Sequence, residues 1–388
     1  MLKIQLRQWA NHHPIPLFVG FTYLLFWGIW LPTSSATFAS QLTQIPQLET
    51  DTSSFPSDQH IIFKADTYLS KLTKARLFSG SVLIARNGKV LVTKGYGKAD
   101  RKKHLMNTAQ TKFRIGSMTK QFTAMAILIL QAQDKLNVQD RICTYLADCP
   151  TRWQQITIHH LLTHTSGIPD FTSFPDFKIT MRSPSSPTQM IARFKDKPLA
   201  FQPGEKFSYS NSGYVVLGAI IEQASGKRYE AFLQDNIFVP LQMVNSGYDH
   251  NKRDLAVGYR DQTNLADFID MSIPYAAGGL YSTVEDLYRW DQALYTDKLI
   301  PKSLRDKMFT SFGGFGYGYG WGIGKEDDGS ARRRHRPVIS HIGGIQGFSS
   351  SIARYPNDKV VIIVLGNRED GNSGDIGVQL AKIVFGEK

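Results

Sequence analysis

Apolar and polar positions recur at two different periods along this chain, and each period predicts a different kind of element. From position 60 to 77 the apolar residues return at helical spacing, which predicts a helix. Residues 81–86 and 89–94 are short runs of mainly aliphatic side chains, which predict two strands. Asn87-Gly88 between them favours the tight turn of a β-hairpin. A strongly apolar helix is expected to begin near position 117.

The C-terminal part of the chain returns to strand patterns. Residues 315–323 alternate large side chains with glycine, which predicts a strand that another part of the chain approaches closely. A short strand is expected at 338–341, and a hairpin at 348–365 around the turn 356–358. A closing helix is expected at 376–385.

The middle of the chain, from about 150 to 294, combines helical patterns with long loops that contain proline and glycine. Apolar helices are expected at 215–221 and at 284–294, where Ser282 and Glu285 resemble a capping box. Hairpins at both ends with helices between them predict an α+β fold, an α/β sandwich. In this fold an antiparallel sheet is flanked by helices and joined to a mostly helical second lobe.

Residues 1–39 have the layout of a targeting segment. Lys3 and Arg7 precede an apolar run at 15–31, and small residues follow it. The run is long for a signal peptide and just long enough for a membrane span. We therefore expect export, with residues 1–39 as a signal peptide or an N-terminal membrane anchor, and a periplasmic or other extracytoplasmic location. A polar spacer is expected at 40–57, followed by one folded domain at 58–388.

Composition adds constraints on partners. With 42% hydrophobic and 20% charged residues the chain has the composition of a globular protein. Its formal net charge of +12 is spread along the sequence, apart from one cluster at 332–336. No nucleic-acid-binding motif accompanies that cluster, so a solvated loop is favoured over a polyanion site and no nucleic-acid partner is expected. Nothing in the sequence indicates a cofactor.

Two residue pairs leave alternatives open. Cys143 and Cys149 could close a small loop by a disulfide in an exported protein, or remain as buried thiols. His160 and His164 have a spacing found in some metal sites, but no acid lies between them and no third ligand is apparent. A packed helix end is the favoured interpretation, and no metal is expected.

Candidate chemistry appears where the apolar helix begins, in the segment Ser117-Met118-Thr119-Lys120. Residues three apart share a helix face, so the Lys120 amine can reach the Ser117 hydroxyl. The free N–H groups at a helix start favour negative charge on whatever the hydroxyl attacks. A lysine acting as a base near neutral pH needs a pKa about 3 units below its reference of about 10.4. Burial in an apolar cleft can lower the pKa of a lysine by that amount.

Two later motifs, Tyr209-Ser210-Asn211 and His341-Ile342-Gly343-Gly344, follow this candidate in a sensible order along the chain. With them the chain resembles the serine β-lactamase and penicillin-binding protein superfamily from about residue 63 to 385. The likeness is greatest to the branch that holds class C β-lactamases, D-alanyl-D-alanine carboxypeptidases and related esterases. It implies that residues 58–388 form a β-lactamase/transpeptidase-like serine hydrolase domain.

The resemblance also implies roles for the catalytic residues. Ser117 would be the nucleophile that forms an acyl-enzyme, and Lys120 its general base or proton relay. Tyr209, as a tyrosinate or as a hydrogen-bonded relay, would move protons for the leaving group and for the deacylating water. Asn211 would orient Lys120 and the substrate. Which residue serves as the base in acylation is left open between Lys120 and Tyr209.

The last motif is expected to bind substrate. By resemblance, Gly343 and Gly344 would form a strand edge beside the nucleophile, and the N–H groups of Gly344 and Ser117 would form the oxyanion hole. Many relatives carry a lysine where this chain has His341, which is mostly neutral at pH 7. That difference weakens the expectation for penicillins or a terminal D-Ala carboxylate, and favours a D-amino-acid peptidase or an esterase. The cluster at 332–336 could supply a substitute charge, and Asn367 is either a further substrate contact or a turn residue.

Two functions from different classes follow from these observations. The first is an exported serine hydrolase acting on a small-molecule or peptide substrate, including fragments of peptidoglycan, with weak β-lactamase activity as a further option. The second is a catalytically silent penicillin-binding-like sensor or cell-wall-binding protein on the same fold. The intact set of Ser117, Lys120 and Tyr209 favours the enzyme. An α/β-hydrolase is not expected, because the sequence has no Gly-x-Ser-x-Gly motif.

Overall fold

A computed structural model describes residues 56–251, 254–327 and 335–387, which all belong to one unit of the chain that begins at Ser54. The predicted targeting segment and most of the cluster at 332–336 lie outside the described residues. Within the described part, no helix has both the length and the apolar character needed to cross a bilayer.

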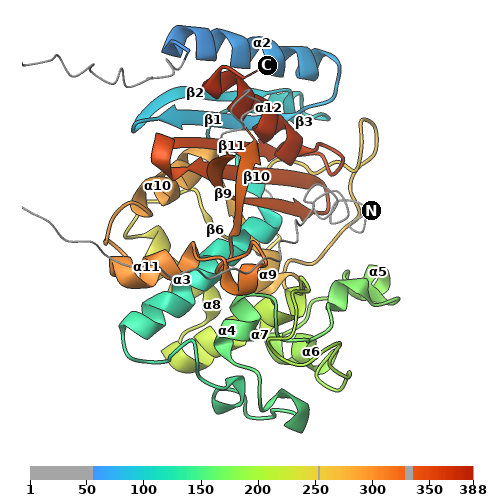
Figure 1. Ribbon diagram of the computed structural model, residues 1–388. Coiled ribbons are helices and arrows are strands. Elements are labelled where there is room, and N and C mark those ends of the chain that lie inside the picture. The colour runs from blue at the N-terminus through green and yellow to red at the C-terminus, as the bar shows by residue number, and fades with distance from the viewer. Residues whose placement is uncertain (1–55, 252–253, 328–334, 388) are drawn as a thin grey trace, which may run out of the picture. The chain divides into compact units, whose positions relative to one another are not determined.

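A six-stranded antiparallel sheet forms the centre of this unit (Figure 1). Its strand order is β2-β1-β11-β10-β9-β8, so the N-terminal hairpin is completed by strands from the other end of the chain. The register of β1 on β11 runs from Gly80 opposite Gly366 to Arg86 opposite Val360. The strands are β1 Gly80–Arg86, β2 Lys89–Tyr96, β8 Gly322–Asp327, β9 His335–Ile345, β10 Phe348–Tyr355 and β11 Val360–Gly366.

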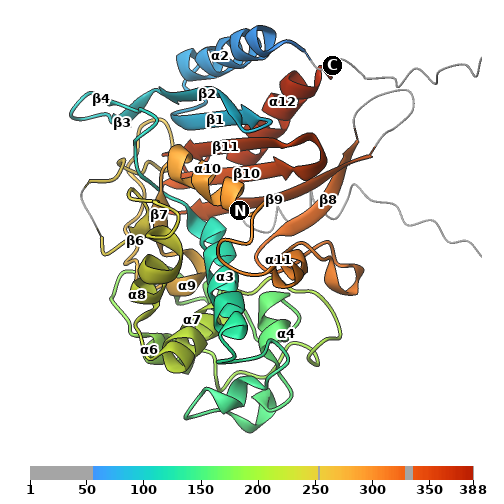
Figure 2. The same ribbon diagram turned by 90° about the vertical axis from the view of Figure 1, so that its left-hand side faces the viewer.

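The central strands of the sheet are buried on both faces, because helices cover both sides. Helices α2 (Asp58–Lys74) and α12 (Ser373–Phe385) cover one face, as both views show (Figures 1 and 2). Helix α10 (Val284–Ala293) and the helical lobe cover the other face. Strand β11 sends Val360, Ile362 and Val364 into the first core and Val361, Ile363 and Leu365 into the second.

The helical lobe is built around α3 (Thr119–Ala132), in which every residue from Thr119 to Leu130 is buried. Helix α3 packs against α7 and α9 and leads from the sheet into the lobe (Figure 2). The predicted class, an antiparallel sheet flanked by helices with a mostly helical second lobe, is therefore confirmed. The other helices here are α4 Ile158–Leu162, α5 Phe177–Thr180, α6 Pro187–Ala192, α7 Asn211–Ser225, α8 Tyr229–Leu233, α9 Tyr275–Gly278 and α11 Lys302–Met308.

The turn between β1 and β2 is the predicted one, because Asn87 and Gly88 have the positive φ values, 53° and 76°, that it requires.

Two small sheets lie outside the six-stranded sheet. One small sheet is a short hairpin of β3 and β4, which follows β2 in the chain. The other has the strand order β5-β7-β6, and its strand β5 lies just before Ser117. The short strands are β3 Lys98–Asp100, β4 Leu105–Met106, β5 Phe113–Arg114, β6 Gly247–Tyr248 and β7 Leu280–Ser282.

The strand predicted at 315–323 is wrong for most of its length, because β8 begins only at Gly322. Gly316 and Gly320 have φ values of 69° and 75°, so the backbone turns where an extended strand was expected. The close approach expected of these glycines is real. A side chain at Gly320 would place its Cβ 2.6 Å from the carbonyl oxygen of Lys120. The alternating pattern thus describes a loop packed tightly against α3.

The cap predicted for α10 is also wrong by one residue. Thr283 is the N-cap, and its hydroxyl accepts a hydrogen bond from the N–H of Asp286 at 3.1 Å. Ser282 instead pairs with Ser246 across the small sheet, with their hydroxyl oxygens 2.7 Å apart. Both residues are sound capping types, so only the register of the preceding strand distinguishes them.

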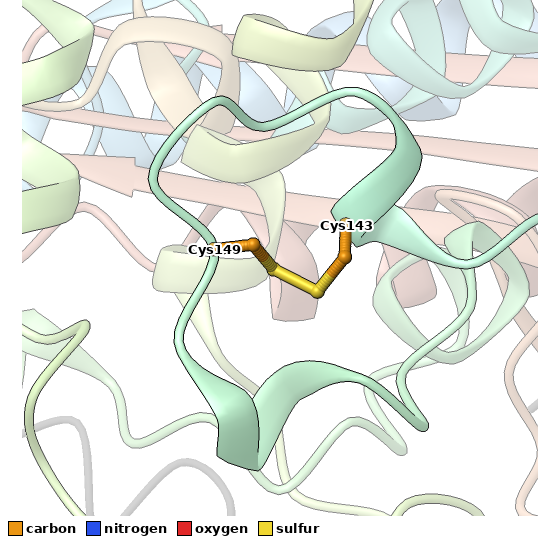
Figure 3. Close-up of a disulfide and its surroundings, with 2 residues drawn as sticks. All are labelled: Cys143 and Cys149. Atoms are coloured by element: carbon orange, nitrogen blue, oxygen red, sulfur yellow. A yellow bond between two sulfur atoms is a disulfide. The ribbon is translucent and has the colours of Figure 1, made fainter.

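The two cysteines are joined by a disulfide that closes a small loop at the edge of the helical lobe (Figure 3). This settles the alternative left open between a disulfide and free thiols. Cys143 and Cys149 are six positions apart. A disulfide that closes a loop of this size stabilises the folded state by about 2 kcal/mol, because it lowers the conformational entropy of the unfolded chain.

Candidate active site

Ser117 lies in a single 3₁₀ turn, Gly116–Met118, immediately before α3. The turn is fixed from one side by β5, which pairs with β7, and from the other by β9. Gly116 has a φ of 51°, and a Cβ there would lie 2.9 Å from the carbonyl oxygen of Gly344. Only glycine allows this approach, which holds Ser117 against strand β9.

Lys120 is fully buried in the first turn of α3. Its Nζ lies 3.0 Å from the Ser117 Oγ, 2.8 Å from the Asn211 Oδ1 and 2.8 Å from the carbonyl oxygen of Ala277. Burial lowers the pKa of Lys120 from 10.5 to about 7, although the nearby carboxylate of Asp170 opposes the shift. A lysine with its pKa lowered in this way can be present as the neutral amine near neutral pH.

The three contacts of Lys120 fit both protonation states, because an ammonium donates to all three oxygens and a neutral amine donates to two of them and accepts from the Ser117 hydroxyl. An uncharged amine has two N–H donors and one lone pair, whereas an ammonium has three donors and cannot accept. In the neutral form the two N–H groups donate to the oxygens of Asn211 and Ala277, which can only accept. The lone pair is then left to receive the proton of the Ser117 hydroxyl.

Tyr209 lies across the nucleophile from α3. Its ring centroid is 4.8 Å from the Lys120 Nζ, and its hydroxyl makes a polar contact with Ser117. Burial raises the pKa of Tyr209 above its ordinary value of 10.0, with Asp170 adding to the rise and the contact with Ser117 opposing it. The phenol is therefore neutral at pH 7, which favours the relay over the tyrosinate for this residue.

The ring of Tyr209 is held by a buried histidine. The His164 ring packs on it with centroids 4.2 Å apart, and the His164 Nδ1 accepts a hydrogen bond from the N–H of Ser210. Burial lowers the pKa of His164 well below 6.5, with the charge of Lys120 adding to the effect. His160 has a separate structural role, because its Nδ1 accepts from the N–H of Thr157 in a capping box. In the described part of the chain no group of three or more potential ligands is placed to hold a metal ion.

Asn211 is the first residue of α7, so that helix begins earlier than its apolar pattern indicated. The amide nitrogen of Asn211 donates to both carboxylate oxygens of Asp170, each at 3.3 Å, and its backbone N–H donates to one of them at 3.1 Å. These bonds assign the amide orientation and turn the Asn211 Oδ1 toward Lys120. Sequence analysis missed Asp170, since a single aspartate in a loop carries no local signal of its partner 41 positions away.

Strand β9 carries the last motif past Ser117. Strand β8 pairs with β9 only as far as Ser340, so among the described strands none pairs with residues 341–345 on that side. Gly343 allows close packing, because a Cβ there would lie 2.0 Å from the carbonyl oxygen of Ile115. A Cβ at Gly344 would meet nothing within 4 Å, which leaves space on the edge beside Ser117.

His341 lies at the start of this free edge, with its ring centroid 6.5 Å from that of Tyr209. Its Nδ1 donates to the carbonyl oxygen of Ile342 at 2.6 Å, so its Nε2 accepts from the Tyr317 hydroxyl at 2.9 Å. Burial, and secondarily the charge of Lys120, lower the pKa of His341 to about 3. At neutral pH this position therefore holds no cation.

The structure thus brings together side chains from four distant segments: Ser117 and Lys120, Tyr209 and Asn211, the edge at Gly344, and Asp170. Asn367 is not part of this group. Its buried amide donates to the carbonyl oxygen of Lys98 in β3 at 3.0 Å and to that of Val257 at 2.9 Å. Of the two alternatives left open for Asn367, a substrate contact or a turn residue, these hydrogen bonds favour the structural one.

Comparison with known proteins agrees with this architecture. The sequence profile of the Beta-lactamase family matches residues 65–382. Bacillus subtilis PbpX is 34% identical over 285 residues, covering 72% of this chain and 71% of that protein. A teichoic acid D-alanine hydrolase of Staphylococcus aureus is 29% identical over 316 residues, covering 80% of this chain and 74% of the relative.

Solved structures give the same result. The octameric penicillin-binding protein homologue from Pyrococcus abyssi superposes with a TM-score of 0.74 at 31% identity, covering 84% of this chain and 78% of that one. The D-amino acid amidase from Ochrobactrum anthropi SV3, in complex with L-phenylalanine amide, gives a TM-score of 0.67 at 26% identity, with coverage of 83% and 98%.

The fold and these relatives define a serine hydrolase of the β-lactamase/transpeptidase fold. The chain belongs to the Beta-lactamase family.

Proposed function

We propose that this protein is an exported serine hydrolase that cleaves an amide or ester of a small or peptide-like substrate through an acyl-enzyme on Ser117. The observation that carries the proposal is the buried Lys120 amine, 3.0 Å from the Ser117 hydroxyl and with a pKa lowered to about 7. The sequence-predicted catalytic residues Ser117, Lys120 and Tyr209 are retained in these roles. Asn211, His341, Gly343 and Gly344 are proposed to bind substrate or to shape its site.

In the first half-reaction the Ser117 oxygen attacks the carbonyl carbon while its proton passes to the Lys120 Nζ. The N–H groups of Ser117 and Gly344 hold the oxyanion, and each such donor is worth about 3–4 kcal/mol of transition-state stabilisation. Tyr209 gives a proton to the leaving nitrogen or oxygen and recovers one from Lys120. In the second half-reaction water attacks the ester, its proton passes to the same relay, and Ser117 is released with a carboxylic acid product.

The substrate class follows from the charge of the site and from the relatives. A neutral His341 gives no fixed cation for the carboxylate of a penicillin or of a terminal D-Ala. One relative is a teichoic acid D-alanine hydrolase and a structural neighbour is a D-amino acid amidase. We therefore favour esters and amides of D-amino acids over β-lactams as substrates of this chain.

Export is proposed on two grounds. Residues 1–39 have the layout of a signal peptide or anchor, and Cys143 and Cys149 form a disulfide, a bond that persists in oxidising compartments. The proposed organisation remains a targeting segment at 1–39, a spacer at 40–57 and the hydrolase domain at 58–388.

A substrate panel tests the proposed activity. We expect the purified full-length protein to hydrolyse p-nitrophenyl acetate and the p-nitroanilides of D-alanine or D-phenylalanine. The kcat/KM for these substrates is expected to be at least about 100-fold above that for nitrocefin, because neutral His341 offers no charge to bind the nitrocefin carboxylate. Initial rates measured by absorbance give the comparison. Faster turnover of nitrocefin than of every ester and amide would refute the proposed substrate class.

Asp170 provides a second test, of the positioning of Asn211. Asp170→Asn keeps the shape but leaves one oxygen where two now accept from the Asn211 amide, so Asn211 is held less firmly. We expect kcat on p-nitrophenyl acetate to fall by about 10-fold to 100-fold with little change in KM. The matched control is Asp176→Asn, an exposed aspartate of the same loop region that pairs with Arg193. Equal activity of both variants and the wild type would show that Asp170 has no such role.

A further inference from the structure

A cavity of about 220 Å³ opens where the β9–β10 hairpin meets the loop 254–268. Its walls are mainly apolar, and two of its large side chains, Leu265 and Phe268, are exposed to solvent at 65% and 50%. Exposed apolar side chains around a concavity are typical of ligand sites. The lining residues are Arg114, Leu255, Ala256, Gly258, Leu265, Ala266, Asp267, Phe268, Gln346 and Phe348.

Two residues that line this cavity are close in the chain to the proposed nucleophile and to Gly344. Arg114, on its wall, is three residues before Ser117, so their Cα atoms are at most about 11 Å apart. Gln346, another lining residue, is the first residue after β9 and is two positions beyond Gly344, so their Cα atoms are at most about 7 Å apart. A substituent of a few carbon atoms on a substrate held at Ser117 can span this distance.

The direction of β9 identifies which part of the substrate reaches the cavity. His341 and the Tyr209 ring lie at one end of the free edge, and Gly344 lies against the turn that carries Ser117. The leaving group must face Tyr209, which supplies its proton. The acyl group therefore extends the other way along the edge, past Gly344 toward Gln346 and Phe348.

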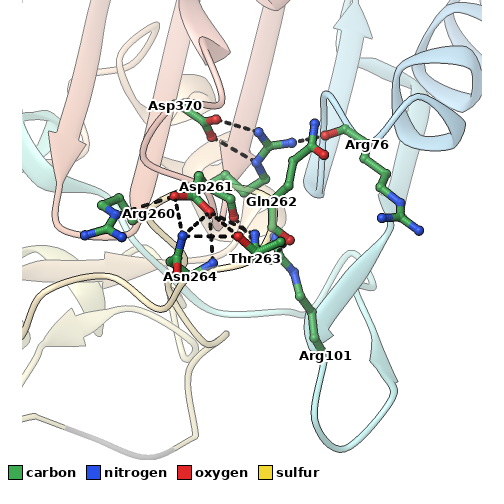
Figure 4. Close-up of polar contacts among 9 residues, drawn as sticks. Arg76, Arg101, Arg260, Asp261, Gln262, Thr263, Asn264 and Asp370 are labelled. Atoms are coloured by element: carbon green, nitrogen blue, oxygen red, sulfur yellow. Dashed lines mark hydrogen bonds and ion pairs between the residues drawn. The ribbon is translucent and has the colours of Figure 1, made fainter.

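The wall formed by the loop is held in place before any ligand binds (Figure 4). The Arg101 guanidinium donates to the carbonyl oxygens of Asp261 and Gln262, at 3.1 and 2.6 Å, and the Asp261 carboxylate accepts from Thr263 and Asn264. The buried Asn367 amide pins the carbonyl of Val257 at 2.9 Å. A preformed wall lowers the ordering cost of binding.

The charges at the cavity are already paired. Arg114 contacts the buried carboxylate of Asp249 at 2.7 Å, and Asp267 lies 3.5 Å from Arg182. A charged substituent would have to compete with these ion pairs, whereas an apolar one would gain by burial. The volume also sets a size, because an apolar cavity of about 150 Å³ is enough to hold benzene.

We propose that this cavity binds the side chain on the acyl portion of the substrate and selects a neutral, compact apolar group of about benzyl size. The inference rests on the proposed acyl-enzyme at Ser117 and adds the acyl specificity of that site. It predicts hydrolysis of phenylacetyl or phenylalanyl esters and amides in preference to acetyl or acidic ones.

Two p-nitrophenyl esters, the acetate and the phenylacetate, test the proposal with the full-length protein. After correction for their hydroxide-catalysed rates, we expect kcat/KM to be at least about 10-fold higher for the phenylacetate. Ala266→Trp fills the cavity and is expected to lower this ratio by about 10-fold or more. Phe268→Ala removes an exposed wall and is expected to lower it about fivefold. Because Phe268 is half exposed, its removal leaves the core intact.

Gln262→Trp is the matched control, since it puts the same bulk on the same loop at an exposed position outside the cavity. Its ratio of the two kcat/KM values is expected to equal that of the wild type. Hydrolysis that depends on Ser117 but shows no phenylacetyl preference, or a preference unchanged by Ala266→Trp and Phe268→Ala, overturns the inference alone. Hydrolysis that persists in Ser117→Ala overturns the proposed function on which the inference rests.

Discussion

Replacing Ser117 by alanine is expected to lower kcat on p-nitrophenyl acetate by at least about 10⁴-fold, the scale seen when a covalent nucleophile is removed. The reason is local. The Lys120 amine and the proposed oxyanion donors stay in place, but no hydroxyl remains to form the acyl-enzyme. Steady-state rates give the loss. A fluorophosphonate probe followed by peptide mass spectrometry is expected to modify Ser117 in the wild type and to leave the variant unlabelled.

Ser210→Ala is the matched control for this variant. Ser210 is a buried serine between Tyr209 and Asn211, and its hydroxyl has no hydrogen-bond partner in the described structure. Removing that hydroxyl therefore breaks no bond, and activity and melting temperature are expected to stay near those of the wild type. Equal probe labelling of wild type and Ser117→Ala would place the nucleophile elsewhere and refute the proposed mechanism.

The strands of the sheet could be predicted from the sequence because the patterns that indicate them are local. The run 360–365 is recognised as a strand because it is short, continuously apolar and preceded by a turn, and Asn87-Gly88 needs only its own backbone preference. The order of the strands is less local. No periodicity in the sequence predicts that β1 pairs with β11, more than 270 positions away.

The sequence-based predictions are wrong or incomplete where tertiary contacts determine the backbone conformation or the partner of a side chain. Residues 315–321 alternate like a strand, yet Gly320 turns because it must lie against the carbonyl of Lys120. Asp170 was missed for the related reason that its partner, Asn211, reaches it only in the folded lobe. The reactive pair Ser117 and Lys120 was found because a helix puts residues three apart on one face, a relation that the sequence displays directly.

The second large effect is expected at Lys120, and it is a dependence on pH. Only the neutral amine can accept the Ser117 proton, so kcat/KM is expected to rise about tenfold per pH unit below a pKa of about 7 and to level off above it. Lys120→Met removes the base and is expected to lower kcat/KM by at least about 10³-fold at every pH. Rate profiles from pH 5 to 9 on a neutral ester measure both effects.

The rising limb of the pH–rate profile, with its midpoint near pH 7, can be assigned to Lys120 because the neighbouring imidazoles have lower pKa values. Burial lowers the pKa of His341 to about 3 and that of His160 to about 4, and it lowers the pKa of His164 well below 6.5. Asp170 supplies the discriminating variant, since its carboxylate raises the Lys120 pKa. Asp170→Asn is therefore expected to move the limb to lower pH while it lowers kcat. A limb that keeps its position in Asp170→Asn, or that survives in Lys120→Met, would mean that another group is the base.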